Sequence, residues 1–323
     1  MKNLFLIILI LKSLNINSQS KTVNVTVDER MELITTVQYL SGYFLLTQAD
    51  INYTKDIDFY FNGYKNHKAV ELLKDMQSNF FSFGRVPMVM YHYDFPSFKL
   101  KHEFSLKEQS LIKYEKNKDK IQQFFKELKD FYKVTNFHQF YQNHKELYNQ
   151  IINNVKNEIE KHNNIVEIIE AHYGVEKKSY NVILTPLLHD GGFGIVIQSN
   201  TGEDLYAIIG PSQSSVGVPY YNPQKLLQDY VIHEFSHSFT NTLVDTFYDE
   251  LKTYSCLYNS IKDVMKKQAY TTWQSCLYEH MVRANEIILA KELLGNKVAE
   301  ELYNKDVEDN SFIYLKGLIP LIK

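Results

Sequence analysis

The stretch YVIHEFSHSF, residues 230–239, contains the pattern HExxH in His233, Glu234 and His237. On a helix, residues four apart project from one face, so both imidazoles can bind one metal ion while Glu234 lies beside the open coordination position. This pattern is typical of zinc hydrolases, most often peptidases. A match at only three positions also arises by chance, so the neighbouring residues have to show whether it marks a metal site.

These neighbours favour a buried helix. Glu234 is the only Asp, Glu, Lys or Arg within residues 230–239, whereas a surface helix would interleave Lys and Glu. Asn222 followed by Pro223 is a good N-cap and first-turn pair, which predicts a helix from about residue 223 to 245. The alternative is that both histidines are core residues bonded to the backbone. An unpaired carboxylate among apolar neighbours is costly, and this favours the metal site.

A catalytic zinc ion needs three protein ligands and one open position, so a third ligand has to come from elsewhere in the chain. The metzincin extension HExxHxxGxxH is excluded, because Thr240 and Leu243 stand at its Gly and His positions. The other common solution is a Glu from a second helix, the gluzincin plan. The candidates downstream are Glu250, Glu279, Glu286 and Glu292, with Asp245 and Asp249 as weaker options.

A second helix is predicted from about residue 269 to 294. Glu279 and Arg283 form an i,i+4 pair among apolar residues, which favours Glu279 as the metal ligand and Arg283 as a cation that supports it. Glu286 shares the face of Glu279 two turns further on and is the second choice. The alternative for the pair is an ordinary surface salt bridge.

Three short β-branched runs precede the HExxH stretch, at residues 181–186, 193–198 and 205–209. A small sheet followed directly by the metal-binding helix is the order of the zincin catalytic half, in which a strand edge lines the cleft and binds an extended peptide. We expect residues 193–198, which follow Gly191 and Gly192, to provide this edge. An internal strand after a tight hairpin is the alternative.

The chain before residue 176 is predicted to be mixed and then largely helical. Residues 22–27 alternate as a strand does, whereas residues 28–43 and 67–76 have helical apolar spacing. From about residue 106 to 172, apolar residues recur every three and four positions, which predicts two helices or a helical hairpin with a break near Thr135 and Asn136.

The fold class is therefore α+β, with a largely helical N-terminal region, residues 19–175, and a zincin-like catalytic region, residues 176–323. Residues 1–18 combine a basic start, a short apolar run and small polar residues, which predicts a signal peptide and a secreted or periplasmic protein. No run is long enough for a membrane span. The net charge of −3 does not indicate the basic surface that binding to nucleic acid requires.

The two cysteines, Cys256 and Cys276, leave two possibilities open. They form either a disulfide that closes a loop of about 20 residues, or two separate thiols. Neither lies in a CxxC pattern, so we do not expect them to bind metal.

Four stretches carry a resemblance to a known family: VDERMEL (27–33), YFNGYKNHKAV (60–70), HEFSHSF (233–239) and EHMVRA (279–284). The chain resembles a family of exported bacterial proteins that is catalogued as a domain of unknown function and placed among gluzincin-like metallopeptidases. The resemblance covers most of the mature chain and implies a zinc peptidase fold with His233, His237 and Glu279 at the ligand positions. Tyr230 departs from the Val or Thr often seen before HExxH. The VDER run has no physical role evident from the sequence.

These observations predict a zinc-dependent metallopeptidase acting on a peptide or protein substrate, in which Glu234 is the general base beside a metal-activated water. A Tyr or His is expected to hold the oxyanion, and Tyr303, Tyr314 and His280 are the candidates. Two alternatives remain: a non-catalytic exported binding module on a zincin fold, and a zinc hydrolase of a non-peptide bond. Glu234 argues against the binding module, because a structural zinc site needs no base.

Overall fold

A computed structural model of the protein describes residues 21–46, 51–79, 81, 83–101, 117–214 and 217–322. The signal peptide expected at residues 1–18 lies outside this part of the chain, as does the beginning of the helical stretch predicted from residue 106. Across the described residues, no helix combines the length and the apolar character that crossing a membrane requires.

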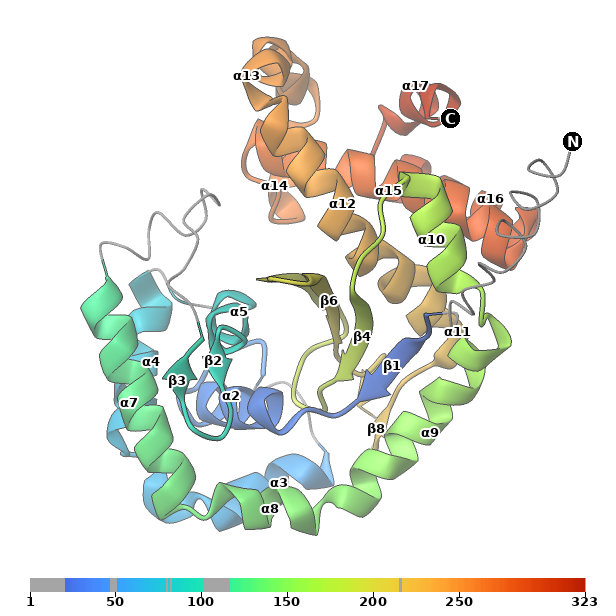
Figure 1. Ribbon diagram of the computed structural model, residues 1–323. Coiled ribbons are helices and arrows are strands. Elements are labelled where there is room, and N and C mark those ends of the chain that lie inside the picture. Colours follow the sequence, from blue (N-terminus) through green and yellow to red (C-terminus); the bar gives the residue numbers. More distant parts are fainter. Residues whose placement is uncertain are drawn as a thin grey trace, which may run out of the picture.

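A four-stranded sheet with the order β1-β4-β6-β5 lies at the centre of the protein (Figure 1). Its strands are β1 (Val23–Thr26), β4 (Ser179–Leu184), β5 (Gly192–Ser199) and β6 (Gly202–Ile209). The first three in this order pair in parallel, whereas β5 pairs antiparallel to β6. All four stretches predicted as strands are thus confirmed, and within the described residues β5 is an edge strand. Its hairpin with β6 turns at Gly202, where φ is 123° and a side chain would be strained.

The strand β1 belongs to the region predicted as residues 19–175, whereas the other three strands belong to the region 176–323. Because β1 pairs with β4 from Val23 opposite Tyr180 to Thr26 opposite Ile183, the two regions share one sheet. The central strand β4 is buried over most of its length, as expected for a parallel strand covered on both faces.

Helices enclose this sheet on several sides, and α7, α8 and α9 form an arc around it (Figure 1). The predicted helices at residues 28–43 and 67–76 are confirmed as α2 and α4, with ends shifted by one to three residues. The helices before β4 are α2 (Glu29–Leu40), α3 (Asn52–Tyr60), α4 (Lys68–Asn79), α5 (Arg85–Met90), α7 (Lys118–Val134), α8 (Phe137–Asn143), α9 (Lys145–Lys161) and α10 (Ile165–Tyr173). Short elements complete this half: η1 (Asn62–Tyr64), β2 (Tyr93–Asp94) and β3 (Lys99–Leu100).

The two helices or hairpin expected up to residue 172 are in fact four helices in the described part, α7 to α10. The predicted break is present at Asn136, whose φ of 49° places it in the left-handed region and ends the run of α7. Further breaks follow at His144 and around residues 162–164, where no Pro or Gly marks them. Apolar periodicity passes through these breaks, because each helix turns its apolar face to the same core.

The HExxH stretch lies in a continuous helical segment made of α11 (Pro223–Lys225), the π-helical turn η2 (Leu226–Val231) and α12 (Ile232–Thr246). The Asn222 side chain accepts a hydrogen bond from the Lys225 backbone N–H at 3.0 Å, which confirms the predicted N-cap. The predicted helix over residues 223–245 is therefore confirmed, apart from the π-helical turn. Such turns are frequent at functional sites.

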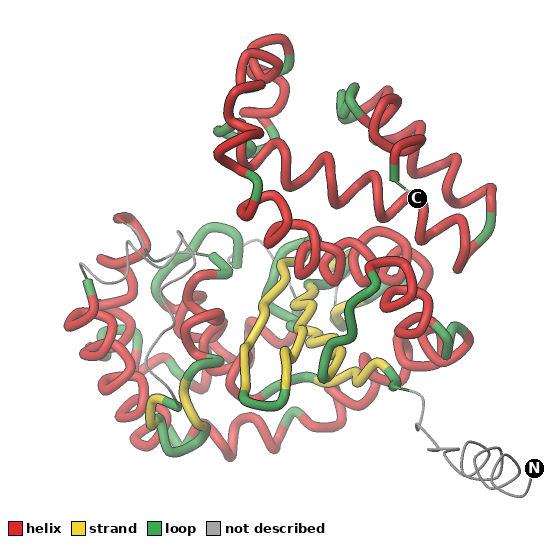
Figure 2. The backbone as a smooth tube through the Cα atoms, turned by 45° about the horizontal axis from the view of Figure 1, so that its top comes forward, coloured by secondary structure: helices red, strands yellow, loops and turns green. Residues whose placement is uncertain are grey.

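After α12 the chain builds a separate group of helices around its own apolar core, which includes Met265, Cys276, Phe312 and Leu315. In Figure 2 these helices project to one side of the strands. They are α13 (Tyr248–Leu251), η3 (Lys252–Ser260), α14 (Lys262–Lys267), α15 (Trp273–Leu294), α16 (Asn296–Asn304), η4 (Lys305–Asp309), α17 (Leu315–Leu318) and η5 (Ile319–Leu321). A small hairpin, β7 (Gln213–Ser214) and β8 (Pro219–Tyr220), precedes α11.

Helix α15 joins this group to the body of the protein, because Cys276 packs in the second core and Leu289 in the first. It begins at Trp273, four residues after the predicted start at residue 269, and a capping box between Thr272 and Ser275 fixes this end. Of the two alternatives for the cysteines, the structure has separate thiols: Cys256 is exposed and Cys276 is buried.

Candidate metal centre

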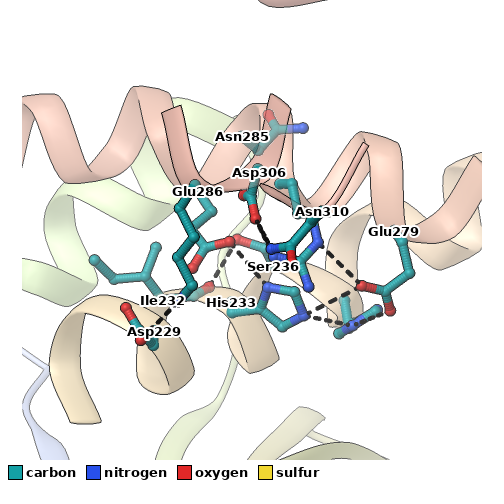
Figure 3. A network of polar contacts seen from close by, with 12 residues as sticks. Asp229, Ile232, His233, Ser236, Glu279, Asn285, Glu286, Asp306 and Asn310 are labelled. Carbon is teal, nitrogen blue, oxygen red and sulfur yellow. Dashed lines mark hydrogen bonds and ion pairs between the residues drawn. The ribbon is translucent and has the colours of Figure 1, made fainter. Parts of the chain in front are cut away.

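Helices α12 and α15 pack against each other and bring the three predicted ligands together (Figure 3). His237 Nε2 lies 3.2 Å from His233 Nε2 and 3.3 Å from Glu279 Oε1, and His233 Nε2 lies 3.6 Å from Glu279 Oε2. Ligand atoms at tetrahedral positions about 2.0–2.1 Å from a zinc ion are about 3.3 Å apart. The three distances are close to this value, although the two histidines face different oxygens of Glu279, and one ligand atom from each residue lies within 4.8 Å of the other two. The triangle of ligand atoms is therefore near the size that a zinc ion requires.

The carboxylate of Glu279 supports this fit. Its Oε2 atom is buried and has no hydrogen-bond partner, and the residue as a whole is 8% exposed. Ion pairs at 3.6 Å with His233 Nε2 and Arg283 Nε only partly offset the cost of burying this oxygen without a hydrogen bond, which is about 1–3 kcal/mol for a neutral group and more for a charged one. A cation between the three ligand atoms would satisfy it.

The Nδ1 atoms of both histidines have partners of their own. His233 Nδ1 lies 3.0 Å from Glu286 Oε2, and His237 Nδ1 lies 3.1 Å from Asn241 Oδ1. If each Nδ1 carries the proton and donates to these oxygens, each Nε2 presents its lone pair to the centre, which is the arrangement that metal-binding histidines need. Asn241, one turn after His237, was not anticipated from the sequence, although i,i+4 spacing on the same helix could have indicated it.

Glu286, the second choice for the third ligand, therefore contacts the opposite side of the His233 ring from Glu279. Figure 3 shows Glu286 and Glu279 on either side of the His233 ring. Glu286 contacts Nδ1, whereas Glu279 contacts the Nε2 side. Glu286 thus orients His233, and it does not reach the triangle of ligand atoms.

Arg283 lies behind Glu279, as the i,i+4 spacing predicts. Its Nε is 3.6 Å from Glu279 Oε2, and its Nη1 donates to Asp306 Oδ1 at 2.8 Å. Asp306 is fully buried and also accepts from Asn310, and the guanidinium stacks over Phe312 at 4.5 Å. Burial opposes ionisation of Glu279, but the two imidazoles in their protonated form and the Arg283 guanidinium hold its pKa well below its usual range.

Glu234 lies buried where β5 crosses α12. A Cβ atom on Gly192 would be 3.1 Å from Glu234 Oε1, and one on Gly194 would be 2.9 Å from the Glu234 carbonyl oxygen. Only glycine lets the edge strand approach the helix this closely, so the Gly-rich start of β5 is required for packing against α12. Burial raises the pKa of the Glu234 carboxyl above its usual value, which is the direction that suits a general base.

The remaining candidates lie away from the triangle. Asp245 accepts from Gln274 and Tyr278, and Asp249 and Glu292 are exposed. Tyr314 donates to the Leu257 carbonyl, His280 Nδ1 donates to the Cys276 carbonyl, and Tyr303 packs on the second core. These three candidates for holding an oxyanion are thus engaged within the C-terminal helices.

Tyr270 lies in the turn before α15 and was missed by the sequence reasoning. Burial, followed by the negative charge of Glu279, raises its pKa, so its hydroxyl lies within electrostatic reach of that carboxylate. A single Tyr in a turn gives no sequence signal that it will lie near a metal ligand.

The loop before β5 is tied to the start of the metal-binding helix. Tyr230 donates to Asp190 Oδ1 at 2.6 Å, and Lys225 donates to Asp190 Oδ2 at 2.9 Å. Tyr230, the residue that departs from the usual pattern before HExxH, therefore anchors the edge strand beside Glu234.

Comparison with known proteins identifies the family of this chain. The chain matches no curated protein and no solved structure at a significant level. A family model described as a domain of unknown function (DUF4932) matches residues 23–322, from β1 to the last described residue. The match includes both helices of the metal centre, and the chain therefore belongs to the DUF4932 family.

Proposed function

We propose that the protein is an exported zinc-dependent metallopeptidase with a zincin-like, gluzincin-type centre. The observation that carries the proposal is the triangle of His233 Nε2, His237 Nε2 and a Glu279 carboxylate, whose Oε2 is buried without a hydrogen-bond partner. Two histidines and one glutamate leave a tetrahedral ion one open position, which is the donor set of catalytic zinc. Export rests on the signal peptide predicted from residues 1–18.

When bound, zinc supplies a Lewis acid that activates water and polarises a scissile carbonyl. Glu234, one residue after His233, takes the proton of the attacking water and passes it to the nitrogen of the leaving amine. Glu286 and Asn241 hold the two imidazoles in orientation, and Arg283 holds the Glu279 carboxylate from behind.

The edge strand β5 supports a peptide as the substrate. Within the described residues it pairs on one side only, and its Gly192 and Gly194 lie against Glu234. An extended peptide can add to such an edge by main-chain hydrogen bonds and thereby bring a peptide bond next to the general base. A structural metal site would need neither the free edge nor a buried carboxylate beside the ligands.

The test combines metal analysis with hydrolysis. We expect the purified mature protein to contain about one zinc ion per chain and to cleave casein, and we expect a strong chelator to abolish cleavage until zinc is restored. Stoichiometric zinc without cleavage of casein or of peptides would argue for a binding module instead. Absence of bound zinc after purification with added zinc would overturn the proposal as a whole.

A further inference from the structure

Three partly exposed rings lie together at the start of β5. Phe83 contacts Phe193 edge to face at a centroid distance of 5.0 Å, and it contacts His189 in the same way at 5.5 Å. Phe193 packs so closely over Gly84 that a Cβ atom there would lie 2.8 Å from the ring. We call Phe83, Phe193 and His189 the aromatic cluster.

The aromatic cluster lies on the face of β5 that points away from the metal-binding helix. Gly192 and Gly194 direct their Cβ positions at Glu234 of α12. Side chains alternate between the two faces of a strand, so Phe193 points to the opposite face, where Gly84 and Phe83 meet it. The Cβ position of Gly191 is directed at the His189 ring, 3.0 Å from its Nε2, which places His189 on that same face.

The backbone at Phe83 is unusual for an aromatic residue. Its φ of 51° lies in the left-handed region, and the Gln38 side chain donates to its carbonyl oxygen at 3.3 Å. A left-handed conformation costs an L residue with a side chain roughly 1–2 kcal/mol. The fold thus places the Phe83 ring over Phe193 at an energetic cost instead of burying it fully in the core.

We infer that the aromatic cluster is an apolar subsite, a surface of three rings that contacts a large apolar or aromatic side chain of the peptide substrate. This inference rests on the proposed function. A peptide paired with the free edge of β5 places alternate side chains on the two faces of the sheet. On the face of α12 they meet Glu234 and the metal centre. On the other face the residue opposite Phe193 has its Cβ about 4.5–5.5 Å from that of Phe193, within contact of the aromatic cluster.

The chemistry of the aromatic cluster determines which substrate side chains it can bind. Two phenyl rings and an imidazole offer an apolar wall with ring edges and faces for an aromatic partner. Burial lowers the pKa of His189, which keeps its ring uncharged near neutral pH and leaves no attraction for an acidic side chain. We therefore expect Phe, Tyr, Leu or Met at this substrate position, and exclusion of Asp and Glu.

The experiment uses internally quenched peptides that vary one position at a time among Phe, Leu, Ala and Asp, cleaved by the zinc-loaded mature protein. At one position we expect kcat/KM for Phe or Leu to exceed that for Ala by roughly 10–200-fold, the usual discrimination of an apolar pocket. Phe83→Ala should reduce this preference at least tenfold with unchanged zinc content. Phe83→Leu should retain most of it, and Phe59→Ala, at a phenylalanine that is 88% exposed, should match the wild type.

Cleavage without side-chain preference at any position, or a preference that survives in folded, zinc-loaded Phe83→Ala, overturns the apolar subsite and leaves the peptidase intact. No cleavage of any peptide by the zinc-loaded wild type overturns the proposed function, and the apolar subsite with it. If Phe83→Ala does not fold by circular dichroism, Phe83→Leu decides. A preference that is retained but smaller than that of the wild type supports the apolar subsite, and a preference equal to that of the wild type counts against it.

Discussion

His233 Nδ1 and Glu286 Oε2 lie 3.0 Å apart in a buried hydrogen bond. Glu286 and Glu279 are seven residues apart on α15, two helical turns, so one helix presents a carboxylate to each side of the same imidazole. One carboxylate orients the ring and the other faces the metal position. Such outer partners of metal-binding histidines raise the basicity of the ligand and fix its tautomer.

Glu279 and Glu286 should therefore differ in their effect on zinc binding. Glu279→Ala should abolish zinc retention nearly as fully as His237→Ala, because each removes a ligand atom from the triangle. Glu286→Ala should weaken zinc binding by about 10–100-fold, since it removes only the orienting bond. The measurement is the zinc that remains after dialysis against a graded chelator series. Glu292→Ala, at an exposed glutamate on the same helix, is the control, and stronger zinc loss from Glu286→Ala than from Glu279→Ala would move the third ligand to Glu286.

The second prediction separates metal binding from chemistry. Glu234→Gln keeps the size of the side chain beside β5 but removes the base. Zinc content should stay near that of the wild type, while kcat for peptide cleavage falls by roughly 10²–10⁴. Both quantities can be measured on the same preparation, by metal analysis and steady-state kinetics. Full activity in this variant would remove Glu234 from the mechanism.

The sequence was sufficient for the parts of this site that local pattern determines. The HExxH spacing placed His233 and His237, and the i,i+4 pair of Glu279 and Arg283 lies next to them as expected. The N-cap at Asn222 also follows from local chemistry alone. Each of these features depends on residues within one or two helical turns.

The parts of the site that the sequence did not predict depend on contacts between distant segments. Asp306, which pairs with Arg283, comes from a π-helical turn 23 residues later, and no spacing rule leads to it. Phe83 and Phe193 are more than a hundred residues apart and meet only because the segment before α5 folds onto the start of β5. Roles of this kind become visible only in the folded chain.

The VDER stretch shows the same limit, because Arg30 and Glu29 contact tyrosines that are far away in the sequence. Asp28 caps α2 and pairs with Arg30 at 2.6 Å, and the Arg30 guanidinium lies 4.3 Å from the Tyr91 ring centre. Glu29 accepts a hydrogen bond from Tyr132 at 2.9 Å. The stretch therefore fastens the start of α2 to the helices around it, a structural role that the sequence did not reveal.

The third prediction concerns the approach of β5 to the site. In Gly194→Ala the new methyl group would lie 2.9 Å from the Glu234 carbonyl oxygen, so the edge strand must move away from α12. We expect kcat/KM for peptides to fall at least about tenfold, because a displacement of about 1 Å near a reacting centre has large kinetic effects. Zinc content should not change, since both ligand helices are untouched.

Gly63→Ala is the matched control, because a Cβ atom at Gly63 would meet nothing within 4 Å. Its kinetics and zinc content should equal those of the wild type. Wild-type kcat/KM in a folded Gly194→Ala protein would show that the spacing of β5 and α12 is irrelevant to substrate binding.

Glu32 should make the stability of the protein depend on pH. Glu32 on α2 is fully buried and accepts hydrogen bonds from Tyr53 at 2.6 Å and from Thr185 at 3.1 Å. Burial raises the pKa of its carboxyl from 4.5 to about 8. Between these two values the folded chain holds a proton that the unfolded chain has released. The stability contributed by the neutral carboxyl is therefore fully present below pH 4.5 and is lost as the pH rises through about 8.

Glu32→Gln replaces this carboxyl by a neutral group of the same shape that does not titrate. The free energy of unfolding of the variant, relative to the wild type, should rise by up to roughly 1.4 kcal/mol per pH unit between about pH 5 and 8 and then level off. Urea unfolding at pH 5.5, 7 and 8.5 measures the difference. Glu71→Gln, at an exposed glutamate on α4, should show no such trend. A difference between Glu32→Gln and the wild type that stays constant or shrinks with rising pH would mean that Glu32 is ionised in the folded protein.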